Sequence, residues 1–333
     1  MSSDAPSSPY RVYLIGCGPT SLSALEALGE GFRVVGLARE CPADDGHDPV
    51  AALARRLGIP VHPRPTLRSL ERQIGELEPD CVVVSSYDRV LPEAILGRRR
   101  FVNVHYSPLP RYRGRANVNW AVINGERAAG ITIHTIVPGL DAGNILFQQL
   151  IPIHDDQTVA DLYLELNRIQ RERLGAAVRA YIEGDPGAEQ REAEATYCCS
   201  RNPEDGEIDW SRSARQIHDL IRALAPPFPG AFTHLDGRRL AVWKAECLEP
   251  APAYVGRVPG RVVAVSRMDG FVDVLAGEGV VRLHEVQRVE GAREPAATVI
   301  GSVRETLGLR TSDLLSRIER LERILRELGH PAP

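Results

Sequence analysis

Three polar residues have the types and spacing needed to transfer an acyl group between two nitrogens. Asn103 and His105 alternate with valines in FVNVH, so on a β-strand their side chains share one face. Asp141 lies in the turn VPGLDAG, whose glycines let the backbone pass close to a ligand. An amide and an imidazole can stabilise an oxyanion, and a carboxylate can take a proton from an attacking amine. The spacing alone also allows a structural role, because such residues are common at strand ends and in turns.

The segments that would position these residues alternate between strand and helix patterns. Short apolar or β-branched runs predict strands at 11–15, 32–38, 59–63, 81–87 and 101–105. Apolar residues at helical spacing predict helices at 21–31, 48–58 and 67–77. The order predicts an α/β fold with a doubly wound, Rossmann-like, mostly parallel sheet, whose ligand crevice lies beyond the carboxyl ends of the strands.

The second half of the chain has a different pattern. Paired strands at 130–137 and 145–153 and a long helix at 158–184 complete the first domain, and a polar stretch containing Gly and Pro follows. After a helix at 214–224, short strands separated by Gly turns predict a small antiparallel β-barrel of the OB type. The predicted parts are a catalytic domain at 1–190, a linker at 191–208, a barrel at 209–310 and a helical tail at 311–333.

The tail carries apolar residues at heptad positions, namely Leu314, Ile318, Leu321, Leu325 and Leu328. Two heptads are too few to establish a coiled coil. We expect this helix to dock against its own barrel, with a partner subunit, and hence a homodimer, as the alternative.

The composition of the chain bears on its partners, on the state of its cysteines and on its location. With 40 basic and 44 acidic residues and a net charge of −4, the chain lacks the basic excess of a nucleic-acid-binding protein. The six cysteines show no CxxC spacing, which indicates reduced thiols. The first ten residues do not form a signal-peptide pattern and no run approaches 18 apolar residues, so we expect a cytoplasmic protein without membrane contact.

The run from Asn103 to Leu146 resembles the signature of the folate-dependent formyltransferases: an Asn-x-His, a Ser-x-Leu-Pro loop, an Arg-Gly and a Gly-Leu-Asp-Ala-Gly. Methionyl-tRNA formyltransferases are similar. RYRGRANVNWAVINGE is more similar to the domain that formylates UDP-4-amino-4-deoxy-L-arabinose. The similarity covers roughly residues 11 to 305 and leaves out the tail helix.

The resemblance implies roles for particular residues. It makes Asn103, His105 and Asp141 the catalytic triad and 10-formyltetrahydrofolate the co-substrate, with no metal. It places the pterin between two loops, with folate-binding candidates Tyr87, Arg89, Val90, Leu91, Val137, Gly139 and Leu140. The loop after His105 supplies the acceptor-binding candidates Ser107, Pro108, Arg113 and Gly114.

Two other motifs have weaker interpretations. Gly16-x-Gly18 follows the first strand, but Ser21 replaces the third glycine of a dinucleotide fingerprint, so we expect a structural turn and no NAD. In sugar-acting relatives the acceptor approaches this turn. Arg98, Arg99 and Arg100 are expected to form a solvated loop, with a phosphate contact as the alternative.

The acceptor is the open question. In the tRNA enzyme the loop after the second strand is long and basic, whereas here CPADDGHDP (41–49) carries three aspartates and no Lys or Arg. We therefore expect a small-molecule amine, first a nucleotide-linked amino sugar and second an ornithine or hydroxyornithine of siderophore or antibiotic biosynthesis. Methionyl-tRNA, water (a formyltetrahydrofolate hydrolase) and a non-catalytic binding paralogue remain alternatives.

Overall fold

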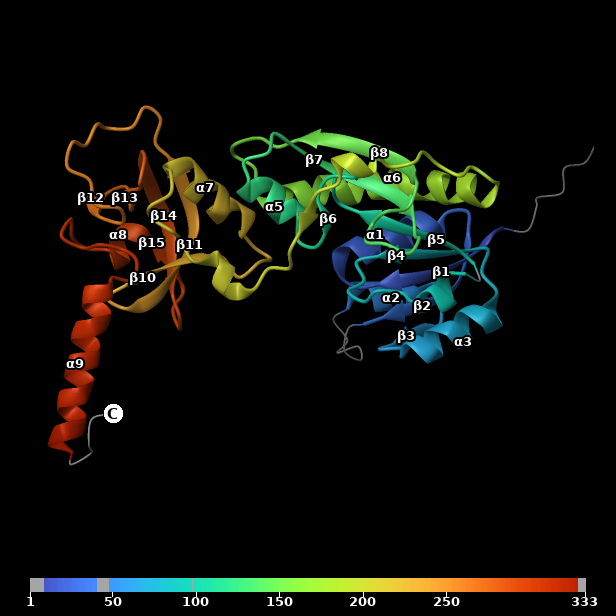
Figure 1. Cartoon of the computed structure of the whole chain (residues 1–333), viewed down its shortest axis with the longest axis horizontal. Coiled ribbons are helices and arrows are strands. Elements are labelled where there is room, and N and C mark those ends of the chain that lie inside the picture. Colours follow the sequence, from blue (N-terminus) through green and yellow to red (C-terminus); the bar gives the residue numbers. More distant parts are fainter. Residues whose placement is uncertain (1–8, 41–47, 98, 329–333) are drawn as a thin grey trace, which may run out of the picture. The chain divides into compact units, whose positions relative to one another are not determined.

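The computed structural model describes residues 9–40, 48–97 and 99–328, so Asp44, Asp45 and Arg98 lie outside the described residues. The chain forms two compact units (Figure 1). The first comprises the described residues up to Val118, Arg127–His154 and Asp161–Ser200, and the second comprises Asn119–Glu126, Asp155–Ala160 and the described residues from Arg201 onward.

The first unit contains a seven-stranded sheet in the order β3-β2-β1-β4-β5-β7-β8. Its first five strands are parallel: β1 (Arg11–Gly16), β2 (Arg33–Arg39), β3 (Val61–Pro63), β4 (Cys81–Ser85) and β5 (Arg100–His105). The last two strands are β7 (Ala128–Thr135), which runs antiparallel to β5, and β8 (Ile145–Pro152), which runs antiparallel to β7. The accompanying helices are α1 (Gly18–Gly29), α2 (Pro49–Arg56), α3 (Leu67–Leu77), α4 (Glu93–Leu96) and α6 (Val159–Ile182). Helix α5 (Asn117–Ile123) begins in this unit and continues into the second. The predicted doubly wound sheet is confirmed.

Burial explains why these strands form. Every residue of β4 is buried, as its continuous apolar run predicts for a central strand. On one face of the sheet, Tyr13, Val82 and Phe101 pack with Leu70 and Ile74 of α3. The core therefore holds the strands rigidly, and their carboxyl ends form a stable edge.

A side-chain cap marks the start of helix α2. Asp48, the last aspartate of the acidic segment, accepts hydrogen bonds from Val50 N (3.0 Å) and Ala51 N (3.4 Å) and so caps α2. Its carboxylate also forms an ion pair with the buried Arg39 at the end of β2. This aspartate is therefore structural.

The second unit is built on an antiparallel sheet in the order β10-β11-β14-β13-β12, with β15 paired to β14. Its strands are β10 (Ala231–Leu235), β11 (Arg238–Cys247), β12 (Val262–Val265), β13 (Val272–Leu275), β14 (Val280–Arg288) and β15 (Arg293–Pro295). Asp236 and Gly237 join β10 to β11 with positive φ (51° and 70°), as an Asp-Gly hairpin turn requires. Helices α7 (Ala214–Ala223) and α8 (Ala296–Val299) contribute to its core.

The tail forms α9 (Thr311–Glu327), but its apolar side chains are exposed. Leu321 is 53% exposed and Leu328 is 69% exposed. The expectation that this helix buries its heptad face against its own barrel is therefore wrong for this structure. No helix among the described residues is long and apolar enough to cross a membrane. The cysteines in the described part of the chain form no disulfide bond with one another.

Candidate active site

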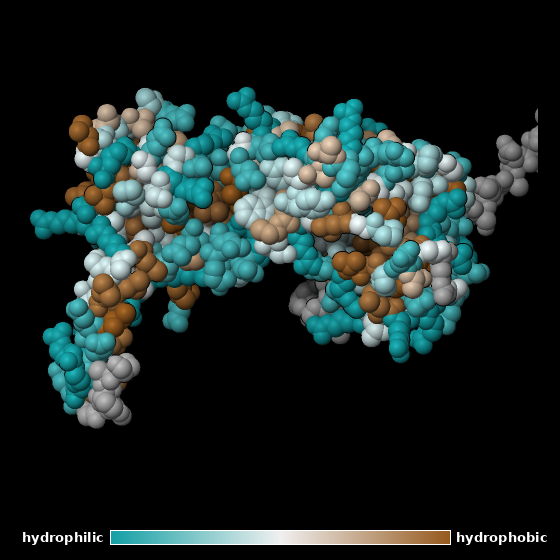
Figure 2. All heavy atoms as spheres, in the orientation of Figure 1, coloured by the Kyte–Doolittle hydropathy of each residue, from teal (hydrophilic) through white to brown (hydrophobic). Residues whose placement is uncertain are grey.

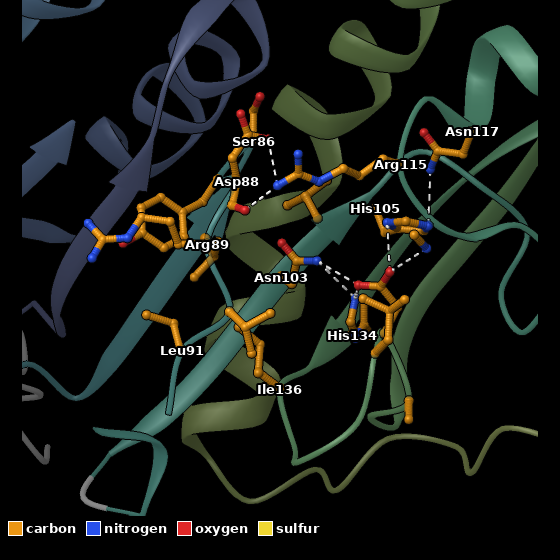
Figure 3. A pocket seen from close by; sticks show the side chains of 18 of the residues that line it. Ser86, Asp88, Arg89, Leu91, Asn103, His105, Arg115, Asn117, His134 and Ile136 are labelled. Atoms are coloured by element: carbon orange, nitrogen blue, oxygen red, sulfur yellow. Dashed lines mark hydrogen bonds and ion pairs between the residues drawn. The ribbon is translucent and has the colours of Figure 1, made fainter. Parts of the chain in front are cut away.

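The three candidate catalytic side chains meet at the carboxyl end of β5 (Figure 3). Asp141 Oδ2 lies 3.6 Å from Nδ1 of His105, and its Oδ1 lies 3.4 Å from Nδ2 of Asn103. His105 is 7% exposed and the Asp141 side chain is 12% exposed. Since little water reaches them, their electrostatic effect on a reacting group is stronger than it would be in bulk solvent.

The turn that carries Asp141 has a strained, well-supported backbone. Asp141 has φ 48°, in the left-handed region that few residues other than glycine adopt. At Gly143 a Cβ would lie 1.7 Å from the carbonyl oxygen of Thr135, so only glycine fits. The backbone N–H of Gly114 donates to Asp141 Oδ2 at 2.9 Å. The carboxylate is thus held by several groups from different parts of the unit.

His105 has partners at both ring nitrogens. Its Nε2 lies 2.9 Å from the carbonyl oxygen of Tyr112 and 3.0 Å from Nδ2 of Asn117. A neutral ring that accepts from Asn117 carries its proton on Nδ1, facing Asp141. A protonated ring can donate from Nε2 to Tyr112 and from Nδ1 to Asp141. The site therefore accommodates both protonation states that a proton-transfer group must adopt.

A second histidine, His134, was not identified from the sequence. Residues Asn103 and His134 are paired across β5 and β7. Nδ1 of His134 lies 2.8 Å from the carbonyl oxygen of Thr135, to which it donates, so Nε2 is left to accept from Asn103 Nδ2 at 3.1 Å. Burial, with His105 nearby, lowers the pKa of His134 to about 4. The neutral ring therefore sets which way the Asn103 amide faces. Polar residues alternate with isoleucines in GITIHT (130–135), which could have drawn attention to His134. Only the pairing of β7 with β5 shows that this histidine lies beside Asn103.

A cavity of about 560 Å³ opens beside these residues. All seven folate-binding candidates line it: Tyr87, Arg89, Val90, Leu91, Val137, Gly139 and Leu140. Val90 is 83% exposed and Leu140 is 51% exposed, so apolar surface at the cavity is left for a ligand to cover. The backbone groups of Val90 and Leu91 form no hydrogen bond with another residue that the structure describes. These features fit a flat, partly apolar ring with a polar edge.

Other lining residues are polar or aromatic. Thr20, Tyr106, Arg115, Asn117 and Tyr163 also face the cavity. Arg115 forms an ion pair with Asp88 at 3.6 Å and donates to its backbone carbonyl (Figure 3). Neither Arg115 nor Asn117 was predicted as a site residue from the sequence, although both lie within the motif that resembles the formyltransferases.

The acceptor-binding candidates separate into two groups. Gly114 lines the cavity, but Ser107, Pro108 and Arg113 are not among the described residues that do. The Ser107 hydroxyl donates to the carbonyl of Arg111 at 2.9 Å, and the Pro108 carbonyl accepts from Arg111 N at 3.1 Å, so both stabilise the loop. Arg113 is 1% exposed and turned away. None of these three residues lines the cavity, so their contact with the acceptor stays a prediction.

Arg113 instead joins the active site to the segment that leaves the first unit. Its guanidinium donates to Glu192 at 3.0 and 2.8 Å and to Oε1 of Gln190 at 2.9 Å. The amide nitrogen of Gln190 then donates to the carbonyls of Asp141 and Gly143, both at 2.7 Å. We call Arg113, Gln190 and Glu192 the linker clamp. Through Gln190, the linker clamp holds the backbone of the turn that carries Asp141.

Pairing of short strands strengthens the same connection. β6 (Arg113–Gly114) pairs in parallel with β9 (Tyr197–Cys198). At Gly114 a Cβ would lie 2.5 Å from the carbonyl oxygen of Cys198, so this approach requires glycine. The Gly114 N–H that supports Asp141 is therefore itself positioned by the linker.

The glycine turn after β1 and the arginine run before β5 make contacts within the fold. A Cβ at Gly16 would lie 1.9 Å from the carbonyl oxygen of Ser85, so this glycine allows β1 and β4 to pack closely. Arg99 pairs with Glu78 at 3.1 Å, and Arg100 lies over the ring of Tyr181. No cluster of three or more His, Cys, Asp or Glu that could hold a metal occurs among the described residues.

A doubly wound sheet with acyl-transfer groups at the carboxyl end of a central strand defines a class of α/β group-transfer enzymes. Within it, residues 44–178 match the Formyl transferase family model, and residues 201–304 match that of the Formyl transferase C-terminal domain. The chain is 35% identical over 297 residues to the methionyl-tRNA formyltransferase of Caldanaerobacter subterraneus subsp. tengcongensis, covering 85% of this chain and 94% of that protein. The chain therefore belongs to the formyl transferase family.

Solved structures support the fold. HypX from Aquifex aeolicus, in complex with tetrahydrofolic acid, superposes with a TM-score of 0.63 at 19% identity over 89% of this chain, which spans about half (48%) of the HypX chain. The N-formyltransferase from Helicobacter canadensis, in complex with folinic acid and dTDP-3-aminofucose, has a TM-score of 0.62 at 18% identity, covering 82% of this chain and 97% of that one.

Proposed function

We propose that this protein transfers the formyl group of 10-formyltetrahydrofolate to the amine of a small molecule, most simply a nucleotide-linked amino sugar. The observation that carries the proposal is that Asn103 and His105 both lie beside the Asp141 carboxylate at the wall of the cavity. Family membership supports formyl transfer as the reaction.

The proposed chemistry needs no covalent intermediate on the protein. The acceptor nitrogen attacks the formyl carbon, and N–H groups of Asn103 and His105 stabilise the oxyanion. The long 3.4 Å contact from Asn103 to Asp141 leaves that N–H able to turn to the formyl oxygen. Asp141 takes the proton of the attacking amine, directly or through water. The oxyanion then collapses, the bond from the formyl carbon to the donor nitrogen breaks, and the proton taken by Asp141 passes to that nitrogen, directly or through water.

The folate side of the proposal rests on the apolar part of the cavity. The backbone groups of Val90 and Leu91, which bond no other residue in the described part of the chain, can bond the edge of a pterin, and Val137 and Leu140 can cover its face. Folate compounds are present in the structures of HypX and the Helicobacter enzyme. In this proposal the folate is a co-substrate that enters with its formyl group and leaves without it.

The acceptor side of the proposal rests on three observations. Thr20, Arg115 and Tyr163 give the cavity a polar and aromatic wall, and a guanidinium suits the phosphates of a nucleotide. The Helicobacter enzyme binds dTDP-3-aminofucose. The net charge of −4 does not favour a polyanion. An ornithine-type amine uses the same chemistry but would not need Arg115 for phosphate.

Methionyl-tRNA is the second candidate acceptor. It is favoured by 35% identity to a methionyl-tRNA formyltransferase over nearly its whole length. Against it stands the acidic segment 41–49, in which Asp44 and Asp45 lie outside the described residues and Asp48 caps α2.

The deciding experiment measures tetrahydrofolate release from 10-formyltetrahydrofolate by the purified protein. The acceptor panel contains UDP- and dTDP-amino sugars, hydroxyornithine and charged methionyl-tRNA. Release that depends on an amino sugar, and weakens in Arg115→Ala with an increased KM, supports the proposal. Release that depends on the tRNA or on hydroxyornithine replaces the proposed acceptor. Release without any amine indicates a hydrolase, and no release with any acceptor favours a non-catalytic paralogue.

A further inference from the structure

Helix α9 presents a continuous apolar face that nothing in the described part of its unit covers. Its exposed members are Leu314 (43%), Leu315 (53%), Ile318 (50%), Leu321 (53%), Ile324 (40%), Leu325 (39%) and Leu328 (69%). Figure 2 shows several apolar residues in a row along this helix. A surface of this kind marks an interaction site, because water contact with so many large apolar side chains is unfavourable.

The spacing of these residues is that of a two-stranded seam. Ile318 and Leu325 occupy a positions of a heptad, and Leu314, Leu321 and Leu328 occupy d positions. A β-branched residue at a with leucine at d favours two parallel helices. The seam therefore fits a second helix of the same kind running in the same direction.

Charges beside the seam select between parallel and antiparallel pairing. Arg317 is at a g position and Glu322 is at the e position five residues later. In a parallel pair, g of one helix faces that e of the other, so Arg317 meets Glu322 of the second copy twice by symmetry. In an antiparallel pair, g lies beside g and e beside e. That arrangement places Arg317 near Ile324 and Glu322 near Leu315, with no opposite charges.

We propose that α9 pairs in parallel with α9 of a second copy of this chain, which makes the protein a dimer through its tail. The heptad face forms the seam, and Arg317 and Glu322 fix its direction. The outer positions carry charges of both signs, among them Glu319, Arg320 and Arg323, which keep the opposite face in water. The proposal does not depend on the proposed function.

The first test measures the mass of the full chain by sedimentation equilibrium across the micromolar range. We expect a concentration-dependent dimer for the wild type and a monomer for Ile318→Glu/Leu325→Glu. Both positions are exposed, so this variant should keep its fold, as circular dichroism would verify. A wild-type monomer throughout that range, or a dimer that survives the double substitution, would overturn the proposal.

The second test addresses direction. Arg317→Glu and Glu322→Arg should each weaken the dimer about five- to tenfold, because two exposed ion pairs are lost and like charges face each other. The combined Arg317→Glu/Glu322→Arg chain should regain an affinity within about twofold of the wild type. Arg320→Glu makes the same charge change on the outer face and should have little effect. Equal weakening by Arg317→Glu and Arg320→Glu, or no recovery in the combined chain, refutes the parallel register.

A third test uses disulfide formation between copies. In a parallel pair each d residue faces its own equivalent, so Leu314→Cys and Leu328→Cys should both oxidise to covalent dimers. The wild type, with its own six cysteines, and Arg320→Cys are the controls. An antiparallel pair would separate the equivalent residues at both ends, and docking on the chain's own second unit would leave both variants monomeric. Either result contradicts the proposal.

Discussion

The buried, neutral state of His134 predicts how acid weakens the first unit. An unfolded histidine binds a proton as the pH falls below 6.5, whereas His134 stays neutral in the fold until about pH 4. Between these values the unfolded chain binds more protons than the folded one, so stability falls as the pH falls. The contribution of His134 is fully present above pH 6.5 and lost as the pH approaches 4.

The size of this effect follows from the same two values. The full difference corresponds to an upper limit of about 3 kcal/mol. Over the practical range from about pH 7.5 to about pH 5, His134 should account for about 2 kcal/mol of lost stability. His134→Gln removes the titrating ring but keeps an oxygen that can accept from Asn103, so this variant should be about 2 kcal/mol less sensitive to that change of pH.

The measurement must report on the correct unit. Trp120, Trp210 and Trp243, the only tryptophans of the chain, all belong to the second unit, so their fluorescence is unsuitable. Amide exchange of β5 and β7, corrected for the intrinsic effect of pH, gives the opening free energy at both pH values. The exposed His154, replaced by Gln, is the matched control. If wild type and His134→Gln lose equal stability, or if His134 titrates by NMR between pH 6 and 7, the reasoning is wrong.

Three further predictions concern turnover. His105→Ala should lower kcat about 10²- to 10⁴-fold without unfolding the unit, since the ring acts on the transition state; near-normal turnover in a folded variant would exclude that role. Asp141→Asn keeps the shape but removes the base, so kcat should fall comparably while folate binding, followed by isothermal titration calorimetry, stays within about threefold. Gln190→Ala should lower kcat about 10- to 100-fold with a smaller change in KM, because the Asp141 turn loses two backbone hydrogen bonds. Gln190→Glu, which cannot donate to those carbonyls, should be equally impaired, whereas Glu189→Ala should not; activity retained in both Gln190 variants would remove the positioning role.

The longer elements could be predicted because their residues carry the signal themselves. The helix predicted at 67–77 has those bounds in the structure, where Thr66 caps it and Glu78 ends it with a left-handed backbone. Short elements such as β6 and β9 could not be predicted, because each exists only through pairing between residues more than eighty positions apart.

The candidate site residues also divide into those that local sequence predicts and those that only distant contacts bring to the site. Asn103, His105 and Asp141 were proposed as catalytic because a strand end and a glycine turn are local patterns and because the run that contains them resembles the formyltransferases. His134 and Gln190 reach the site through sheet register and a returning linker, which spacing does not reveal. Arg113 was predicted to bind the acceptor from the family resemblance, whereas in the structure the loop after His105 turns its side chain toward Glu192.

The linker clamp determines where the enzyme can be cut. Glu192 and β9 lie beyond residue 190, yet they hold Arg113 and Gly114, and Gln190 holds the catalytic turn. A fragment that stopped at residue 190 would keep the side chains of Asn103, His105 and Asp141 and lose part of the frame around them. A fragment carried through Ser200 would retain that frame. The peptide that leaves the first unit therefore also supports the candidate active site, so a protease nick between residues 190 and 197 should impair turnover.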